Sequence, residues 1–116
     1  MRTIRAYELE IERLCATGRL SGFPHLSAGQ EAVAVGVCLL LRDGDLVVSS
    51  HRGHGHCIAK GLDLTAMTAE LFGRATGYSR GKGGSLHIAD PDRGMLGTNG
   101  IVGAGVPIAT GAALST

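Results

Sequence analysis

Apolar and charged residues alternate along the start of the chain with the period of an amphipathic helix. Apolar positions recur at spacings of three and four from Ile4 to Leu14, with charged residues between them. Gly18 interrupts this pattern. The spacing therefore predicts a helix over residues 3–17, with its apolar stripe turned toward a core.

A second apolar run begins with a capping-box pattern. Ser27 stands three residues before Gln30, ahead of the stretch EAVAVGVCLLL. Ser27 is therefore predicted to cap a buried helix. The other elements predicted are a short buried strand over residues 46–50, helices over 52–60 and 64–73, the second capped by Asp63, and a small-residue helix over the last residues.

Residues 77–105 differ from the rest of the chain in their glycine content, because nine of these 29 residues are glycine. Such a stretch is too long for a simple connection and indicates a functional loop. The pattern elsewhere predicts only one strand, and one strand cannot make a sheet. We therefore interpret the sequence as a piece of a longer α/β protein.

Composition and charge narrow the range of functions. A net charge of +1 gives no electrostatic basis for binding nucleic acid or a membrane surface. No apolar run is long enough to predict a transmembrane helix, and the N-terminus lacks the apolar region of a secretory signal. Cys15 and Cys38 lie in apolar stretches without paired spacing, which predicts reduced core thiols in a cytosolic protein.

The stretch HRGHGHC gathers histidines beside an arginine, and three interpretations fit it. The candidate zinc ligands are His51, His54, His56 and Cys57. A structural zinc site needs a second pair of ligands, which is absent. A strand that leads into a helix start beside Arg52 favours an anion site instead, since the free N–H groups and the guanidinium both attract phosphate. Histidines without a ligand are the third interpretation.

Two glycine-rich stretches do not match the nucleotide-binding motifs that they suggest. In GYSRGKGGSLH the spacing is one residue too short for a phosphate loop, and Gly83 stands where Ser or Thr would bind magnesium. In GTNGIVGAG the glycines invert the dinucleotide-binding order. A flexible loop and close helix packing remain the alternatives for these stretches. His25, alone in a loop before a helix, is unremarkable without further context.

Three segments together resemble the alpha subunit of thiamine-diphosphate-dependent 2-oxo acid dehydrogenases. GFPHLSAGQEAVAVG, SSHRGHGHCIAKG and GKGGSLHIADPDRGMLGTNGIVGAGVPIATGAAL follow one another in the family's order. Within the family, the likeness is closest to bacterial pyruvate and acetoin dehydrogenase alpha subunits. The resemblance implies that residues 1–116 are the N-terminal part of a thiamine-diphosphate-binding α/β domain with a doubly wound parallel sheet, mostly helical in this portion.

The resemblance also implies an activity and its partners. The activity is thiamine-diphosphate-dependent oxidative decarboxylation of a pyruvate-like 2-oxo acid, or cleavage of acetoin, with acyl transfer to a lipoyl group. The assembly is a cytoplasmic α2β2 heterotetramer with a beta subunit, served by a lipoyl-bearing acyltransferase. The family's magnesium motif, G-D-G followed by N-N, would lie beyond residue 116. Magnesium is thus an expected cofactor without ligands in this chain, and we expect these residues alone to bind no cofactor usefully.

By motif position, the resemblance assigns roles to seven residues. His25 would face the substrate, and His54 would be its catalytic neighbour. Arg52 would contact the diphosphate. The residues expected to contact or line the cofactor are His51, Arg52, Ala89, Gly100 and Val102.

Two further classes of function remain open at this point. A non-catalytic remnant or interaction module would still pack against a beta-type partner but would turn over nothing. A small metal-binding domain would use the His/Cys cluster. The sequence does not separate pyruvate, branched-chain 2-oxo acids and acetoin as substrates.

Overall fold

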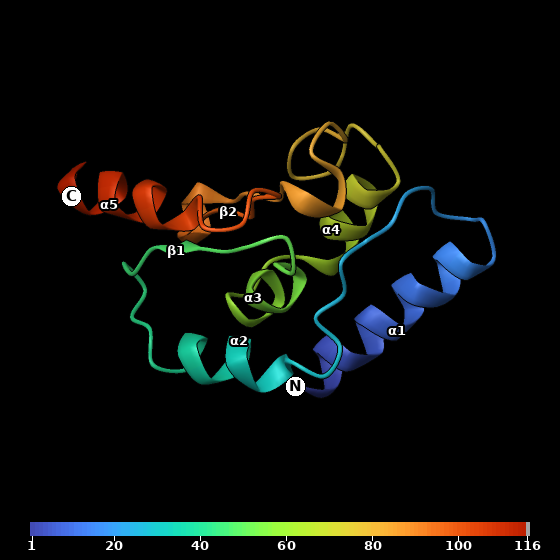
Figure 1. Ribbon diagram of the computed structural model, residues 1–116, viewed down its shortest axis with the longest axis horizontal. Coiled ribbons are helices and arrows are strands. Elements are labelled where there is room, and N and C mark those ends of the chain that lie inside the picture. The colour runs from blue at the N-terminus through green and yellow to red at the C-terminus, as the bar shows by residue number, and fades with distance from the viewer. Residues whose placement is uncertain (116) are drawn as a thin grey trace.

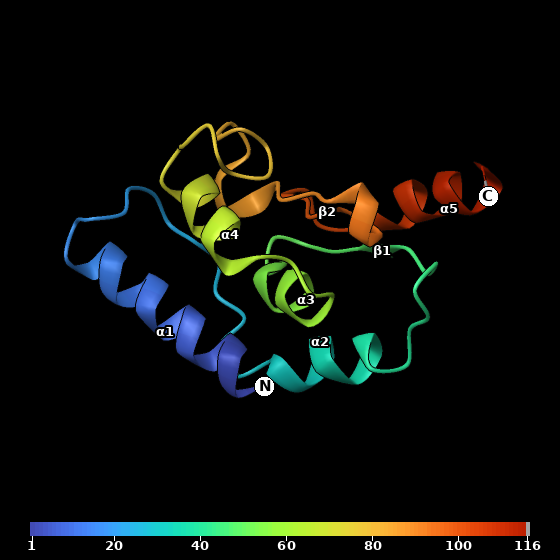
Figure 2. The same ribbon diagram turned by 180° about the vertical axis from the view of Figure 1, so that it is seen from behind.

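The computed structural model describes residues 1–115 and extends over 44 × 27 × 24 Å. A central helix, α3, lies between helix α2 on one side and a short sheet on the other, and α5 projects from the far end of the sheet (Figures 1 and 2). In chain order the elements are α1 (Arg2–Ala16), α2 (Glu31–Cys38), β1 (Val47–Val48), α3 (His54–Ala59), α4 (Leu64–Leu71), the 3-10 turns η1 (Gly84–Leu86) and η2 (Pro91–Arg93), β2 (Met95–Gly97) and α5 (Gly105–Ser115).

Helix α1 confirms the amphipathic pattern. Ile4 and Ile11 are buried, and a charged residue, Glu8, is buried on the same face. The helix ends where Thr17 and Gly18 donate their N–H groups back into its last turn, with Gly18 at φ +69°. The predicted end at Gly18 is therefore correct, because glycine adopts this left-handed conformation without steric cost.

Helix α2 begins later than predicted, and the capping box is wrong. Gln30 is the N-cap, without a side-chain cap, and Ser27 turns its hydroxyl toward Glu8 instead, at 2.6 Å. The Ser27 hydroxyl donates to the ionised Glu8 carboxylate, and this charge-assisted hydrogen bond is stronger than the one that a capping Oγ would accept from a backbone N–H. The helix start is fixed by a paired Arg5 and Glu31, where the Arg5 hydrogen bond lowers the pKa of Glu31 to about 2.

The sheet contains a strand that the pattern did not predict. β1 and β2 run parallel, with Val47 opposite Met95 and Val48 opposite Gly97. The prediction of a single strand over residues 46–50 is therefore wrong in number and in length. β2 was missed because it is three residues long and ends in glycine within the glycine-rich stretch. A mostly helical α/β fold with a parallel sheet is confirmed.

The core is small and aliphatic. The cluster at its centre consists of Val47, Cys57, Leu62, Met67, Ile88 and Met95. Burial raises the pKa of the Cys57 thiol to about 12, so this cysteine behaves as an inert apolar residue. Cys15 and Cys38 are only partly buried, so their prediction as core thiols is wrong.

The remaining helices follow their predictions with small differences. α3 begins at His54, two residues late, after a turn that carries His51 and Arg52 outside the helix. Asp63 caps α4 as predicted, accepting the N–H of Ala66 at 2.8 Å. α5 has no buried residue. No helix within residues 1–115 is both long and apolar enough to cross a bilayer.

The loop after α4 is wound around a buried carboxylate. Glu70 is fully buried, and its two oxygens accept four backbone N–H groups at 2.7–3.0 Å. Burial alone would raise the pKa of Glu70, but the four hydrogen bonds outweigh it and lower the pKa below its ordinary 4.5. The stretch GYSRGKGG is therefore ordered around an anion of its own chain rather than flexible. The donors are Ser79, Gly81, Gly83 and Gly84.

We expect Glu70→Gln to lower the free energy of unfolding by about 3 kcal/mol, because charged hydrogen bonds are worth about 1.5–3 kcal/mol each and the amide leaves donors unpaired. Urea denaturation at pH 7, followed by circular dichroism, measures the change.

The matched control is Glu12→Gln on the exposed face of α1, which should change stability by less than about 0.5 kcal/mol. Since the pKa of Glu70 is lowered, its contribution is present above pH 4.5 and lost as the pH falls. Equal stability of Glu70→Gln and wild type at pH 7 would contradict this account.

Candidate functional site

The candidate site begins at one edge of the sheet. β1 and β2 are parallel, so their carboxyl ends lie at the same edge, where ligands bind in open α/β sheets. The chain leaves β1 through His51 and Arg52 and leaves β2 through Thr98 and Gly100. The topology therefore brings together two of the segments singled out in the sequence.

These two segments are in close contact where Gly53 packs against Thr98. A Cβ atom added at Gly53 would lie 2.0 Å from Thr98 Cγ2, which no real contact allows. The Thr98 side chain cannot rotate away, because its Oγ1 donates to the Leu86 carbonyl at 2.7 Å and accepts the Ile88 N–H at 2.8 Å. Thr98 thus joins a third segment, residues 86–88, to the site.

Two of the predicted cofactor-lining residues of the glycine-rich stretch, Gly100 and Ala89, lie around this junction. Gly100 faces Leu86, since an added Cβ would lie 3.3 Å from Leu86 Cδ1. Ala89 lies beside Gly97, whose added Cβ would be 3.8 Å from the Ala89 Cβ. Val102 is 77% exposed on the segment that leads into α5. The site therefore presents backbone and small side chains on this side.

A fourth segment, the loop before α2, brings His25 to the turn after β1. The rings of His25 and His51 meet edge to face, with centroids 5.2 Å apart. The Arg52 guanidinium donates to the Leu26 carbonyl. The His51 Nδ1 atom is buried, and within residues 1–115 it has no hydrogen-bond partner. This atom is therefore available to bond to a group outside the described residues.

His54 occupies a different environment from its neighbours. It is 1% exposed, its Nδ1 lies 3.2 Å from Glu8 Oε2, and its Nε2 lies 3.0 Å from Ser85 Oγ. The Tyr7 ring meets the imidazole edge to face at 5.9 Å. Both ring nitrogens are thus engaged within the chain, and His54 does not join His25 and His51.

Glu8 anchors this second arrangement and was missed in the sequence. Its other oxygen, Oε1, accepts the N–H and the hydroxyl of Ser27 at 3.0 and 2.6 Å. Burial would raise the pKa of Glu8, but the hydrogen bonds from His54 and Ser27 lower it overall. A carboxylate on the apolar stripe between Ile4 and Ile11 was the available signal, because such a residue is buried only with partners.

The residues proposed as zinc ligands face separate partners. The His56 Nδ1 atom lies 2.9 Å from Ser49 Oγ, and burial lowers the pKa of His56. Cys57 lies in the core. In the part of the chain that the structure describes, no three His, Cys, Asp or Glu side chains are placed to hold a metal ion. The zinc interpretation has no support in this geometry.

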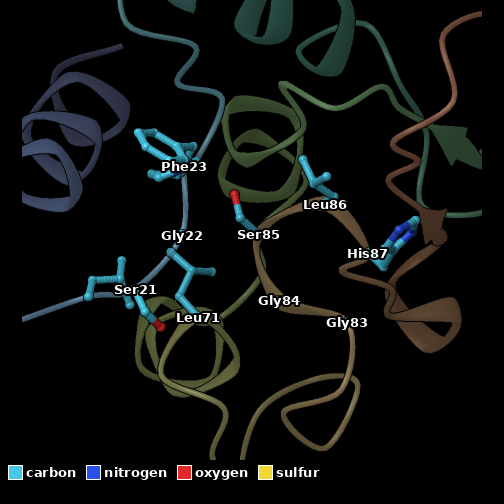
Figure 3. Close-up of a pocket in the computed structure, with 11 residues that line it drawn as sticks. Ser21, Gly22, Phe23, Leu71, Gly83, Gly84, Ser85, Leu86 and His87 are labelled. Atoms are coloured by element: carbon cyan, nitrogen blue, oxygen red, sulfur yellow. The ribbon is translucent and has the colours of Figure 1, made fainter. Parts of the chain in front are cut away.

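Two pockets flank the site. One, of about 300 Å³, lies where β1 ends and α5 begins. It is lined by Val48, Ser49, Ser50, His56, Ile101, Gly103, Gly105 and Val106. The other, of about 280 Å³, lies between the loop at residues 20–24 and the segment 83–87, with Leu71 at its side (Figure 3). Ser85 lines this second pocket.

Comparison with known proteins places the whole chain in one family. A family model described as "Dehydrogenase E1 component" matches residues 1–116. The alpha subunit of the acetoin:2,6-dichlorophenolindophenol oxidoreductase of Bacillus subtilis is 63% identical over 115 residues. The subunit of the same name from Cupriavidus necator is 54% identical, and the pyruvate dehydrogenase E1 component subunit alpha of Rhizobium meliloti is 44% identical. The chain is covered to 99% in each comparison and spans about a third of each relative, 33–34%.

We expect Gly53→Ala to lower the free energy of unfolding by about 1–3 kcal/mol, because the methyl group would overlap a Thr98 side chain held by two hydrogen bonds. The matched control is Gly36→Ala in α2, where an added Cβ meets nothing within 4 Å. Alanine should stabilise that helix by up to about 1 kcal/mol. Thermal unfolding compares the two variants, and equal melting temperatures would contradict the contact.

Proposed function

The chain belongs to the dehydrogenase E1 component family, and we propose that it forms the N-terminal part of a thiamine-diphosphate-dependent dehydrogenase alpha subunit. The reaction proposed is cleavage of acetoin or oxidative decarboxylation of a 2-oxo acid such as pyruvate. The acyl group would then pass to a lipoyl group. Higher identity to the two acetoin-oxidising relatives than to the pyruvate dehydrogenase subunit favours acetoin.

The observation that carries this proposal is the meeting of distant segments at one edge of a parallel sheet. His25, His51 and Arg52 lie together there, beside the segment that contains Gly100. The unpartnered Nδ1 of His51 fits a hydrogen bond to a bound group. The site therefore suits a cofactor with a charged end and a reactive centre.

The residues fit thiamine diphosphate in their chemistry. Arg52 would bind the diphosphate, helped by the start of α5 at the pocket between Ser50 and Gly105. The backbone near Gly100, with Ala89 and Val102, would line the remainder, where small residues permit a close approach. When bound, thiamine diphosphate supplies the electron sink for breaking the bond next to a carbonyl group.

Magnesium is proposed as the companion of the diphosphate. Magnesium prefers several oxygen ligands in octahedral geometry. Residues 1–115 contain no group of three carboxylate or imidazole side chains that could hold it. We place its protein ligands outside residues 1–116, which we take as a partial cofactor domain.

The two catalytic candidates receive different roles. His25 is exposed beside His51, so it can reach a substrate oxygen and donate or accept a proton there. His54 has both ring nitrogens engaged and is buried. We propose that His54 acts through Ser85 and not by touching the cofactor.

A beta subunit and a lipoyl-bearing acyltransferase are the partners proposed. The relatives are named as alpha subunits, which supports a beta partner, and an α2β2 assembly would cover apolar surface that is open here. Val102, Val106 and Leu114 are 72–85% exposed in this chain, which fits a face that packs against further protein. The alternative function, a non-catalytic module that only associates with a beta-type partner, would show the same exposed face without turnover.

Arg52→Ala should weaken thiamine diphosphate binding about 10- to 100-fold, as expected from losing a charged contact of about 1.5–3 kcal/mol. Isothermal titration of the complete alpha subunit with its beta partner, in magnesium, measures the affinity. Arg42→Ala, at an exposed turn, is the control and should leave the affinity unchanged. Equal affinities of Arg52→Ala and wild type would remove Arg52 from the site.

His25→Ala should retain thiamine diphosphate but lower kcat for acetoin about 100-fold or more, since a positioned acid or base contributes about 10²- to 10⁴-fold. Turnover is followed with 2,6-dichlorophenolindophenol as electron acceptor, in the same two-subunit enzyme. Loss of cofactor binding in this variant would give His25 a structural role, and unchanged turnover would exclude it from catalysis.

A further inference from the structure

Three side chains connect the buried face of α1 to the wall of a pocket. Glu8, His54 and Ser85 are joined by hydrogen-bond distances of 3.2 and 3.0 Å. Glu8 and His54 are buried, whereas Ser85 lines the pocket between residues 20–24 and 83–87. In Figure 3 the Ser85 hydroxyl points toward α3, between Phe23 and Leu86.

Chemistry fixes the direction of the hydrogen bonds in this chain of groups. The Glu8 carboxylate already accepts two hydrogen bonds from Ser27 and is ionised at neutral pH, since its pKa is lowered. It can only accept, so His54 Nδ1 carries the proton that faces Glu8. In neutral His54 the Nε2 atom then bears a lone pair and accepts the Ser85 hydroxyl proton.

This arrangement makes Ser85 a group that can exchange a proton. With neutral His54, the Ser85 hydroxyl proton is directed inward, and the lone pairs of Ser85 Oγ remain available on the pocket side. With protonated His54, Nε2–H donates to Ser85 Oγ, and the hydroxyl proton is free to point into the pocket. The same oxygen is thus an acceptor in one state and a donor in the other.

The pocket adjoins the proposed cofactor site. Pro24 lines it next to His25, and Leu86 and His87 line it where they face Gly100. A small substrate at the cofactor would therefore lie near Ser85.

We propose that Glu8, His54 and Ser85 form a proton relay that removes and returns the hydroxyl proton of a small hydroxyketone substrate bound in this pocket. The inference rests on the proposed function and specifies its substrate class. The substrate hydroxyl gives its proton to Ser85 Oγ as Ser85 passes its own proton to His54 Nε2. The transfers leave an alkoxide on the substrate and a cation on His54 that is balanced by Glu8. The reverse transfers return the proton through Ser85 to the substrate-derived oxygen and restore all three groups. Ser85 is the catalytic residue, His54 takes up its proton, and Glu8 positions His54 and balances its charge.

The groups around His54 are consistent with this role. Tyr7, on α1, packs against the His54 ring, and burial raises the pKa of Tyr7 to about 12. Cys57 lies one turn after His54 in α3, and burial raises the pKa of its thiol to about 12. Both are neutral at physiological pH. Glu8 is then the only one of these neighbours with a charge, so a proton on His54 has one counter-ion.

The first test uses the complete enzyme with acetoin as substrate. Ser85→Ala and His54→Gln should each lower kcat about 100-fold, with thiamine diphosphate affinity unchanged. The double variant should be no slower than the slower single variant, because residues of one relay are not additive. Ser85→Thr should restore most of the activity. Thr65→Ala, which removes a hydroxyl from the exposed start of α4, is the control.

The second test does not depend on turnover. Long-range proton–nitrogen NMR spectra of the histidine-labelled protein should show His54 with its proton on Nδ1 at neutral pH, and a shifted Nε2 signal in Ser85→Ala. A proton on Nε2 of neutral His54 would overturn the relay. Wild-type kcat in Ser85→Ala, or additive losses in the double variant, would also overturn it. Failure of wild type to bind thiamine diphosphate would instead refute the proposed function.

Discussion

The fold depends on a charge that is buried where an apolar residue would be expected. Glu8 lies on the buried face of α1, and its two oxygens accept hydrogen bonds from Ser27 and His54. A buried carboxylate is tolerated only when it is fully hydrogen-bonded. Its partners come from the loop before α2 and from α3, so satisfying the charge fixes both segments against α1. The arrangement of the site follows from this requirement.

Glu70 imposes the same constraint on the other half of the molecule. Its carboxylate takes up backbone N–H groups of the following loop, which has no regular structure to satisfy them. The carboxylates of Glu8 and Glu70 therefore fix the positions of loops that the small aliphatic core alone cannot fix. Hydrophobic burial gathers the helices, whereas the two charges determine where individual loops lie, since hydrogen bonds are directional and apolar contacts are not.

The parts of the fold that repeat a local pattern could be predicted, and those set by distant partners could not. The helix over residues 3–17 and the Asp63 cap depend on neighbouring residues and are confirmed. The Ser27 cap failed because Glu8, 19 residues away, competes for the hydroxyl. The motifs identified the segment that contains His51 and Arg52. Pattern alone could not separate His54 from them, because its partners Glu8 and Ser85 lie 46 and 31 residues away.

The order of Glu8 and its partners along the chain has a consequence for folding during synthesis on the ribosome. The first helix emerges with an acidic group on its apolar face, and the groups that satisfy it, Ser27 and His54, are made later. Until then the helix gains more from leaving that face in water than from burying it. Helix α1 therefore buries this face only after α3 has been made.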